Sequence, residues 1–339
     1  MSMDEHFLDL HKNALVVDTH CDTLKCLSSD FTGLRQSMWI DRSKLGLGKR
    51  SEFGHIDLPR LSEGGINCQT FAISSVRSRT PPYALRTAMR QLDIFYMECK
   101  KNEYKIELAK CYDDIMNSIG KRKVAALLSI EGADVIEGDL SMLRIFYRLG
   151  VRMVGLVHSR RNLIADGVAD LRTGGGLSSF GVEVVEELDR LGIIIDISHL
   201  NDEGFWDLIE LTTSPIIASH SSCRVICDHP RNLTDQQIIA LVDRDSVIGI
   251  NFAPSFIHPS YATIERVVDH IDHIVKLVGP EYVGLGSDFD GIASTPVGLE
   301  DVSKMPNITR ELIKRDYSEG DIRKILGENH LRLIKDVIG

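Results

Sequence analysis

Eight runs of apolar residues, each about as long as a β-strand, recur along this chain of 339 residues. They occupy residues 15–19, 66–73, 124–130, 151–157, 193–198, 215–219, 247–252 and 282–287. Between most of them, apolar residues recur at helical spacing, at 82–98, 141–149, 180–191, 202–211, 234–242 and 264–278. Asn201 and Thr234 stand where two of these helices would begin, and both are good N-cap residues. The alternation predicts an α/β fold built from repeated strand–helix units.

The apolar runs are nearly continuous and rich in Val, Ile and Leu, which is typical of parallel strands buried on both faces. Eight such strands separated by helices favour a (β/α)8 barrel, also called a TIM barrel. A Rossmann-type sheet is the weaker alternative, because no Gly-x-Gly-x-x-Gly follows the first run. No linker rich in Pro, Gly or Ser divides the sequence. We therefore predict one domain over residues 1–339, with a helical C-terminal extension at 296–339.

Charge and composition exclude several classes of protein. The formal net charge of −10 argues against nucleic acid as the main partner, because phosphate binding requires a basic face. No uncharged apolar run approaches the ~20 residues that span a membrane. The first residues are acidic and lack the basic and apolar regions of a signal peptide. The seven cysteines are scattered and do not form the pattern of a disulfide framework. These observations predict a cytoplasmic protein that binds no membrane.

Residues that bind metals or transfer protons follow the ends of six of the eight runs. They are His20 and Asp22 after the first run, Glu131 after the third, His158, His199 and His220 after the fourth, fifth and sixth, and Asp288 after the eighth. The active site of a (β/α)8 barrel lies at the C-terminal ends of its strands, so these side chains should meet. Residues two apart on a strand share a face, which places His20 and Asp22 within reach of one ion. Mixed imidazole and carboxylate ligands favour zinc, with manganese, cobalt or iron as alternatives.

Glu131 and His158 each have an alternative interpretation, and Asp18 is expected to lie outside the set of ligands. Glu131 could cap the helix that follows its strand. His158 could be a metal ligand, a donor to an oxyanion or a structural residue. Asp18 shares a face with His20 but lies deeper, so we expect it to support the site without binding metal.

Two further patterns resemble metal sites more weakly. His55 and Asp57 repeat the His-x-Asp spacing, but they lie in a connection just before a proline. A structural Cys2His2 zinc site could also be formed by four residues whose spacing is irregular, namely His220, Cys223, Cys227 and His229. The remaining histidines, including His270 and His273, lie in helical segments and are expected at the surface.

Taken together, these residues resemble the membrane (renal) dipeptidase family, the M19 metallopeptidases of the amidohydrolase superfamily. The motifs that carry the resemblance run in order from about residue 14 to the C-terminus: Asp18-Thr19-His20-Cys21-Asp22, Ser129-Ile130-Glu131-Gly132, Val157-His158-Ser159, Asp196-Ile197-Ser198-His199, Ser219-His220-Ser221-Ser222, Pro230-Arg231-Asn232-Leu233 and Gly286-Ser287-Asp288-Phe289-Asp290-Gly291. The resemblance implies two zinc ions per chain, one held by His20 and Asp22, the other by His199 and His220, with Glu131 bridging them.

The resemblance also implies an activity, the hydrolysis of dipeptides that have a free C-terminal carboxylate, with tolerance of a D-amino acid at the C-terminal position. A hydroxide that bridges the ions would attack the carbonyl, and Asp288 would act first as general base and then as general acid. His158 would bind substrate and donate to the developing oxyanion, while Arg231 would bind the substrate carboxylate. Family members are commonly homodimers, so a homodimer is expected.

Two other functions remain open. Another binuclear amidohydrolase, such as an N-acyl-amino-acid deacylase, would share the metal site. A non-catalytic barrel paralogue is less favoured, because such proteins typically lose ligands and this chain has residues suited to metal binding at all five expected positions.

Overall fold

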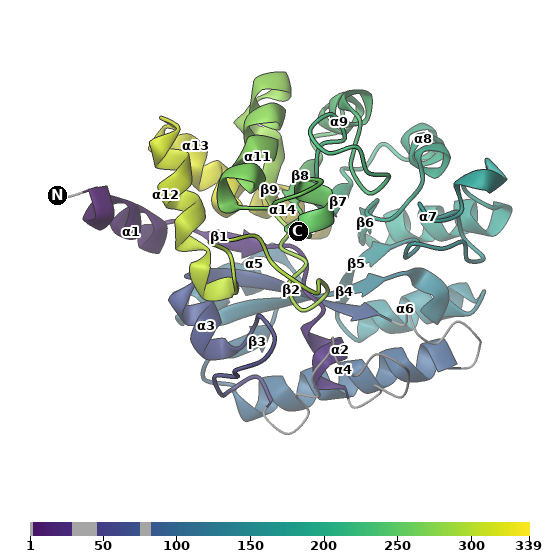
Figure 1. Ribbon diagram of the computed structural model, residues 1–339. Helices are drawn as coiled ribbons and strands as arrows, with labels where there is room; N and C mark the ends of the chain where they lie inside the picture. The colour runs from purple at the N-terminus through teal and green to yellow at the C-terminus, as the bar shows by residue number, and fades with distance from the viewer. Residues whose placement is uncertain (1–2, 29–45, 75–82) are drawn as a thin grey trace.

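The computed structural model describes residues 3–28, 46–74 and 83–339, and its centre is a closed barrel of eight parallel strands (Figure 1). The barrel strands are β1 Val16–Asp18, β2 Ile66–Ser74, β4 Val124–Glu131, β5 Val151–Gly155, β6 Ile194–Asp196, β7 Ile217–Ser221, β8 Val247–Ile250 and β9 Val283–Leu285. They lie in the order β2-β1-β9-β8-β7-β6-β5-β4, and the pairing of β2 with β4 closes the ring. Each strand falls within or overlaps one predicted run, so the (β/α)8 prediction is confirmed.

Strand β4 has neighbours on both edges, and this fixes the position of its last residue. Along one edge it pairs continuously with β2, ending with Ser74 opposite Glu131. On the other edge Glu131 lies opposite Gly155 of β5. The first residues of β4 also pair with a ninth strand, β3 Ile106–Leu108, which stands outside the closed ring. The sequence does not predict β3, because three residues, of which only Ile106 is buried, form no apolar run.

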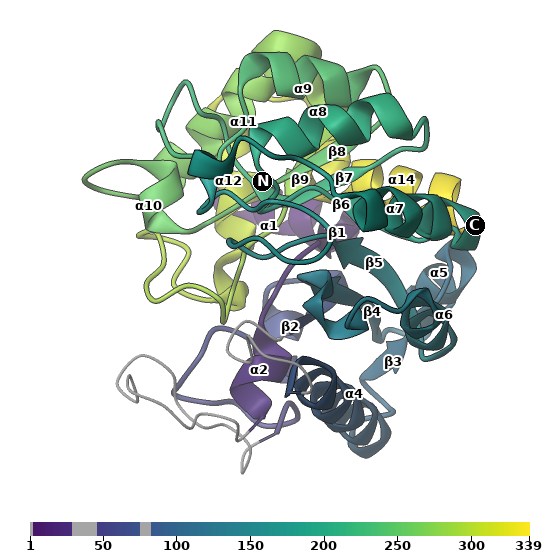
Figure 2. The same ribbon diagram turned by 90° about the vertical axis from the view of Figure 1, so that its right-hand side faces the viewer.

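Helices surround the barrel (Figures 1 and 2). The longer ones are α4 Tyr83–Lys101, α5 Tyr112–Gly120, α6 Leu140–Arg148, α7 Ser179–Leu191, α8 Asp202–Leu211, α9 Asp235–Val242 and α11 Ile264–Val278; the others before the C-terminal region are α1 Met3–Asn13, α2 Thr23–Leu27, α3 Leu58–Glu63 and α10 Pro254–Ile257. Both predicted N-caps are present: Asn201 accepts from the Gly204 N–H at 3.0 Å, and Thr234 forms a capping box with Gln237. None of the helices within the described ranges is long and apolar enough to cross a membrane.

The C-terminal region is largely helical, as predicted, and its last two elements close the N-terminal end of the barrel. It comprises α12 Pro306–Lys314, α13 Glu319–Arg323, a π-helical turn at Lys324–Glu328 and α14 Asn329–Ile338 (Figure 2). Leu331, Leu333 and Ile334 of α14 pack in one hydrophobic cluster with the first residues of several strands. The buried imidazole of His330 lies against Gly284 of β9, where a Cβ atom would be 2.2 Å from its Nε2. The π-helical turn and α14 are therefore part of the barrel core, whereas α12 packs against α1 and α11.

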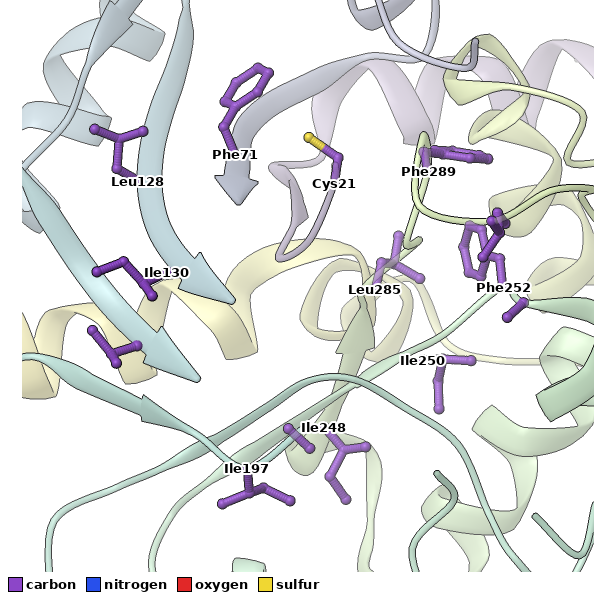
Figure 3. Packing of buried hydrophobic residues seen from close by; sticks show 14 of the residues in the cluster. Cys21, Phe71, Leu128, Ile130, Ile197, Ile248, Ile250, Phe252, Leu285 and Phe289 are labelled. Atoms are coloured by element: carbon purple, nitrogen blue, oxygen red, sulfur yellow. The ribbon is translucent and has the colours of Figure 1, made fainter. Parts of the chain in front are cut away.

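The main hydrophobic cluster continues to the C-terminal end of the barrel (Figure 3). Cys21 belongs to it and is fully buried near Phe71 and Phe289. Its backbone N–H donates to the Thr70 carbonyl at 3.1 Å, and its own carbonyl accepts from the Ala72 N–H at 2.9 Å. The segment after β1 is thus held beside β2, with Cys21 in the apolar core and the residues on either side of it available to the site.

Candidate active site

Seven side chains from six strands converge at the C-terminal end of the barrel. His20 and Asp22 follow β1, Glu131 ends β4, His158 and His199 follow β5 and β6, His220 lies in β7, and Asp288 follows β9. The Oε1 atom of Glu131 is the centre of the cluster, at 3.0 Å from the Nε2 of His199, 3.6 Å from that of His158, 3.7 Å from that of His20 and 3.8 Å from that of His220. The structure therefore brings together all the residues that the sequence singles out at the strand ends.

The spacing of these side chains is that of a metal centre. In three overlapping groups the candidate ligand atoms lie within 4.8 Å of one another: His20, Glu131 and His220; Glu131, His158 and His199; and His20, Asp22 and Asp288. His20 Nε2 and Glu131 Oε2 are buried and have no hydrogen-bond partner among the described residues. Buried polar atoms without partners are costly, and a bound cation would satisfy both. The residues present fit a metal centre, and Glu131 belongs to two of the three groups.

Hydrogen bonds behind the cluster orient two of the histidines. His220 Nδ1 bonds to the Ser219 hydroxyl at 2.7 Å, and that hydroxyl donates to Asp196 at 2.5 Å. His199 Nδ1 bonds to the Ser159 hydroxyl at 3.2 Å, and its backbone lies in the left-handed region with φ at +72°. These contacts leave both Nε2 atoms directed at the centre, which is how ligand histidines are usually held. The sequence does not predict these supporting roles, although Asp196 and Ser219 precede the two histidines within their motifs.

Asp288 lies at the edge of the cluster, with Oδ1 at 4.0 Å from His20 Nε2. Its backbone is in the left-handed region, with φ at +61°, and its N–H donates to the His20 carbonyl at 3.2 Å. The Asn251 amide donates to the second carboxylate oxygen at 3.0 Å, a contact that the sequence does not predict. Burial raises the pKa of Asp288 to about 6; His20 opposes the rise, while the charges of Asp22 and Glu131 add to it. A carboxyl group with a pKa near neutrality can both accept and return a proton.

His158 presents a hydrogen-bond donor to the cluster. Its Nδ1 accepts from the Ser159 N–H at 2.8 Å, so in the neutral ring the hydrogen is on Nε2. Burial lowers the pKa of His158, an effect that the Glu131 charge only partly offsets. A neutral imidazole with an N–H directed at the centre suits the stabilisation of negative charge that develops there.

Two cations border the cluster. Arg231, in the segment between β7 and α9, is buried, and its Nη2 donates to the His220 carbonyl at 3.1 Å. Its Nε is buried without a hydrogen-bond partner among the described residues, and its guanidinium lies 5.6 Å from the Phe256 ring centre. Lys25 of α2 is the second cation, with Nζ at 3.4 Å from Asp22 Oδ1. Lys25 is not among the residues predicted from the sequence, although its spacing of three residues from Asp22 at a helix start was an available signal.

Asp18 lies below the cluster, as expected, and belongs to none of the three candidate ligand groups. Ser287 donates to its carboxylate through both the backbone N–H, at 2.8 Å, and the hydroxyl, at 2.6 Å. Gln69 donates to the same carboxylate at 3.1 Å. Asp18 therefore ties β9 and β2 to β1 just beneath His20.

The residues of the two weaker metal-site patterns form hydrogen bonds with other groups of the protein. Asp57 caps α3 by accepting from the Arg60 N–H at 2.9 Å, while His55 Nδ1 accepts from the Asp290 N–H at 2.9 Å. The thiols of the second pattern also bond elsewhere, that of Cys223 to the His270 carbonyl at 3.5 Å and that of Cys227 to the Ser255 carbonyl at 3.4 Å.

The expectation that His270 lies at the surface is wrong. Its side chain is fully buried on the face of α11 that also carries Val267 and Ile274. Its Nδ1 accepts from the Cys223 N–H at 3.0 Å, and its Nε2 donates to the Ile257 carbonyl at 3.0 Å. Because both ring nitrogens are bonded, the imidazole can be buried at low cost.

Residues 4–338 match the family model described as membrane dipeptidase, peptidase family M19. The chain belongs to this family. It is therefore a metallodipeptidase, and the family and enzyme class predicted from the motifs are confirmed.

Related proteins agree with this assignment. An uncharacterized dipeptidase of Schizosaccharomyces pombe is 34% identical over 351 residues, covering 98% of this chain and 82% of the relative. The crystal structure of dipeptidase AC, an M19 metallopeptidase, has a TM-score of 0.85 at 30% identity and covers 96% of this chain and 99% of its own. A metallopeptidase from Rhodobacter sphaeroides, solved with a phosphinate mimic of the dipeptide L-Ala-D-Ala, has a TM-score of 0.83 at 28% identity, with the same coverage of 96% and 99%.

Proposed function

We propose that this M19 enzyme is a zinc-dependent dipeptidase that cleaves dipeptides with a free C-terminal carboxylate and accepts a D-amino acid at the C-terminal position. The observation that carries the proposal is the convergence of four histidine Nε2 atoms, at 3.0 to 3.8 Å, on one oxygen of Glu131. Beside this cluster lies a buried arginine whose Nε has no hydrogen-bond partner among the described residues.

The residues that would hold two zinc ions are His20 and Asp22 for one, His199 and His220 for the other, and Glu131 for both. Imidazole nitrogens and carboxylate oxygens are the ligands that catalytic zinc sites use. When bound, the ions supply the Lewis acidity that lowers the pKa of a water molecule and polarises the scissile carbonyl.

Two side chains of the protein would move or stabilise charge during the reaction. Asp288 accepts a proton from the attacking water and delivers it to the leaving amine, which its position beside His20 and its raised pKa support. His158 donates its Nε2 hydrogen to the carbonyl oxygen as negative charge develops there.

Arg231 would bind the C-terminal carboxylate of the substrate. A guanidinium group can bind both oxygens of a carboxylate at once, and its binding is strong where water is excluded. A carboxylate one residue beyond the scissile bond then distinguishes a dipeptide from a longer chain. The related Rhodobacter enzyme is solved with a mimic of L-Ala-D-Ala, which supports a D-residue at this position.

The proposal is tested by removing the metal with a chelator, restoring zinc and measuring both metal content by mass spectrometry and hydrolysis of L,L- and L,D-dipeptides. We expect zinc to restore turnover of both kinds of dipeptide. A reconstituted protein that binds no zinc, or one that cleaves N-acyl amino acids but no dipeptide, would contradict it; the latter result would favour the deacylase alternative.

Replacement of the carboxylate-binding group, Arg231→Met, should raise KM for dipeptides at least about tenfold with a smaller change in kcat, because a charge-assisted contact is lost. Steady-state kinetics measure this effect. The matched control is Arg310→Met, which removes an arginine that also lies over an aromatic ring, 5.5 Å from the Phe7 centre, on remote helix α12. An equal rise in KM for the two variants would contradict the proposed role of Arg231 in carboxylate binding. The cytoplasmic location and the homodimer stay predictions.

A further inference from the structure

Lys25 is a cation inside the candidate active site to which the proposed reaction gives no role. It lies on α2, three residues after Asp22, and its Nζ is 3.4 Å from Asp22 Oδ1. Its side chain is 17% exposed, so most of it is covered by protein while part of it still reaches open space. An ammonium group in this setting contributes a fixed positive charge at the border of the site.

The two cations of the site approach the cluster from different strands. Lys25 follows β1, whereas Arg231 follows β7 and donates to the His220 carbonyl, and β8 and β9 lie between those two strands in the sheet order. The charge of the Glu131 carboxylate, where four imidazoles meet, acts electrostatically on both cations. A substrate whose scissile bond lies at this cluster therefore has a cation beyond each of its two ends.

These positions assign one end of a dipeptide to each cation. When Arg231 binds the C-terminal carboxylate, the scissile carbonyl lies at the cluster and the N-terminal residue extends toward α2. The ammonium group of that residue would be repelled by Lys25. A carboxylate on its side chain would instead be attracted, and attraction between charges is stronger in a partly buried site than in water.

We propose that Lys25 is a specificity-determining residue that selects dipeptides with an acidic side chain, aspartate or glutamate, on the N-terminal residue. This inference rests on the proposed dipeptidase function and adds its preferred substrate class. Lysine provides three donor hydrogens on a flexible stem, which suits a carboxylate carried on side chains of different length.

The test compares two pairs of substrates that differ only in charge, Glu-Ala with Gln-Ala and Ala-Glu with Ala-Gln, on the zinc-restored enzyme. We expect kcat/KM for Glu-Ala to exceed that for Gln-Ala at least about tenfold, the size of one charge-assisted hydrogen bond. Lys25→Met should bring this ratio close to one without changing the ratio for the second pair. Lys25→Arg should retain the preference, which shows that charge and not the fold of α2 is being measured.

The control is Lys12→Met on helix α1, outside the site, which should leave both ratios unchanged. Zinc content is measured for every variant, because Lys25 also pairs with Asp22. A Glu-Ala preference that survives Lys25→Met, or equal rates for Glu-Ala and Gln-Ala in the unmodified enzyme, would overturn the inference and leave the dipeptidase function intact. Failure to cleave any of the four dipeptides would overturn the proposed function itself.

Discussion

The two ends of the barrel are made by the same strands, yet they differ in how many polar groups they bury. At the N-terminal end, α14 covers the strands with Leu331, Leu333 and Ile334 and with the imidazole of His330, whose ring nitrogens have no hydrogen-bond partner among the described residues. At the C-terminal end, three carboxylates and four imidazoles share one small volume, and His20 Nε2 and Glu131 Oε2 have no hydrogen-bond partner among the described residues. One end is arranged for burial of apolar surface, the other for binding.

Backbone conformation does not follow this division. Non-glycine residues with positive φ occur at the C-terminal end, at His199 and Asp288, but also just before β4 and β8 at the N-terminal end, at Arg122 and Asp245. The two ends therefore differ in their side chains and not in backbone strain. The lesson is that stability and chemistry can be separated along the barrel axis. Substitutions at each end of the barrel test this separation.

The largest effect is expected from Glu131→Gln at the C-terminal end. The substitution keeps the shape of the side chain but removes the charge shared by two candidate ligand groups. Activity should fall at least about a thousandfold, beyond the 10- to 100-fold typical of groups that only orient ligands. The metal-free protein should also lose some stability, because, against the effect of burial, the neighbouring imidazoles hold the pKa of Glu131 well below its usual range and so favour the charge that is removed.

The matched change at the other end is Leu333→Ala, which should cost about 2–5 kcal/mol of unfolding free energy while kcat of the folded enzyme stays within about twofold. Denaturant titration and steady-state kinetics measure both variants. If Glu131→Gln were the less stable protein, or Leu333→Ala the less active enzyme, stability and activity could not be assigned to different ends of the barrel.

His330 should make the N-terminal end sensitive to acid. Burial lowers its pKa from 6.5 to about 3, so between these values the unfolded chain binds a proton that the folded chain does not. Stability is therefore lost as pH falls below 6.5. The loss attributable to His330 should reach about 2 kcal/mol between pH 7 and pH 5.

The measurement is the unfolding free energy as a function of pH for the unmodified protein and for His330→Leu, whose curve should be flatter by that amount. Leu331→Ala on the same helix serves as the control, since it should lower stability equally at every pH. Parallel curves for the unmodified protein and His330→Leu would show that His330 is not buried in its neutral form.

The smallest effect is expected for Asn251→Ala. Asn251 donates to the Asp288 carboxylate and so favours its charged form. In the metal-free protein its removal should raise the pKa of Asp288 above about 6, and in the zinc enzyme kcat should fall about tenfold. Carbon NMR titration measures the pKa, and Asn307→Ala, which removes an amide on α12, should leave it unchanged. An unchanged Asp288 pKa would mean that burial alone sets its value.

Much of the difference between the two ends could be predicted from the sequence. A parallel strand buried on both faces produces an apolar run, and the barrel fold places the residue that follows each run at the C-terminal end. His20, Glu131, His199 and Asp288 were found in this way. His270 was placed wrongly, although its spacing from Val267 and Ile274 marks it as lying on the buried face of its helix.

Other features depend on three-dimensional contacts that no local pattern contains. Asn251 follows β8 and acquires its role only because β9 lies alongside and carries Asp288. Lys25 differs from Asn251, because its spacing of three residues from Asp22 at the start of α2 is a local signal that the sequence contains. The strand β3 is too short to produce an apolar run.

The pairing of β4 on both edges has a consequence for how enzymes of this kind can diverge. Glu131 is held by Ser74 of β2 and Gly155 of β5, deep in the sheet, whereas Lys25 and Arg231 lie outside the strands. Mutations in α2 or in the segment after β7 can therefore change which molecules are accepted while leaving the centre in place. A combinatorial library that varies Lys25 while leaving the buried residues Leu24 and Leu27 of α2 unchanged should yield enzymes of altered selectivity.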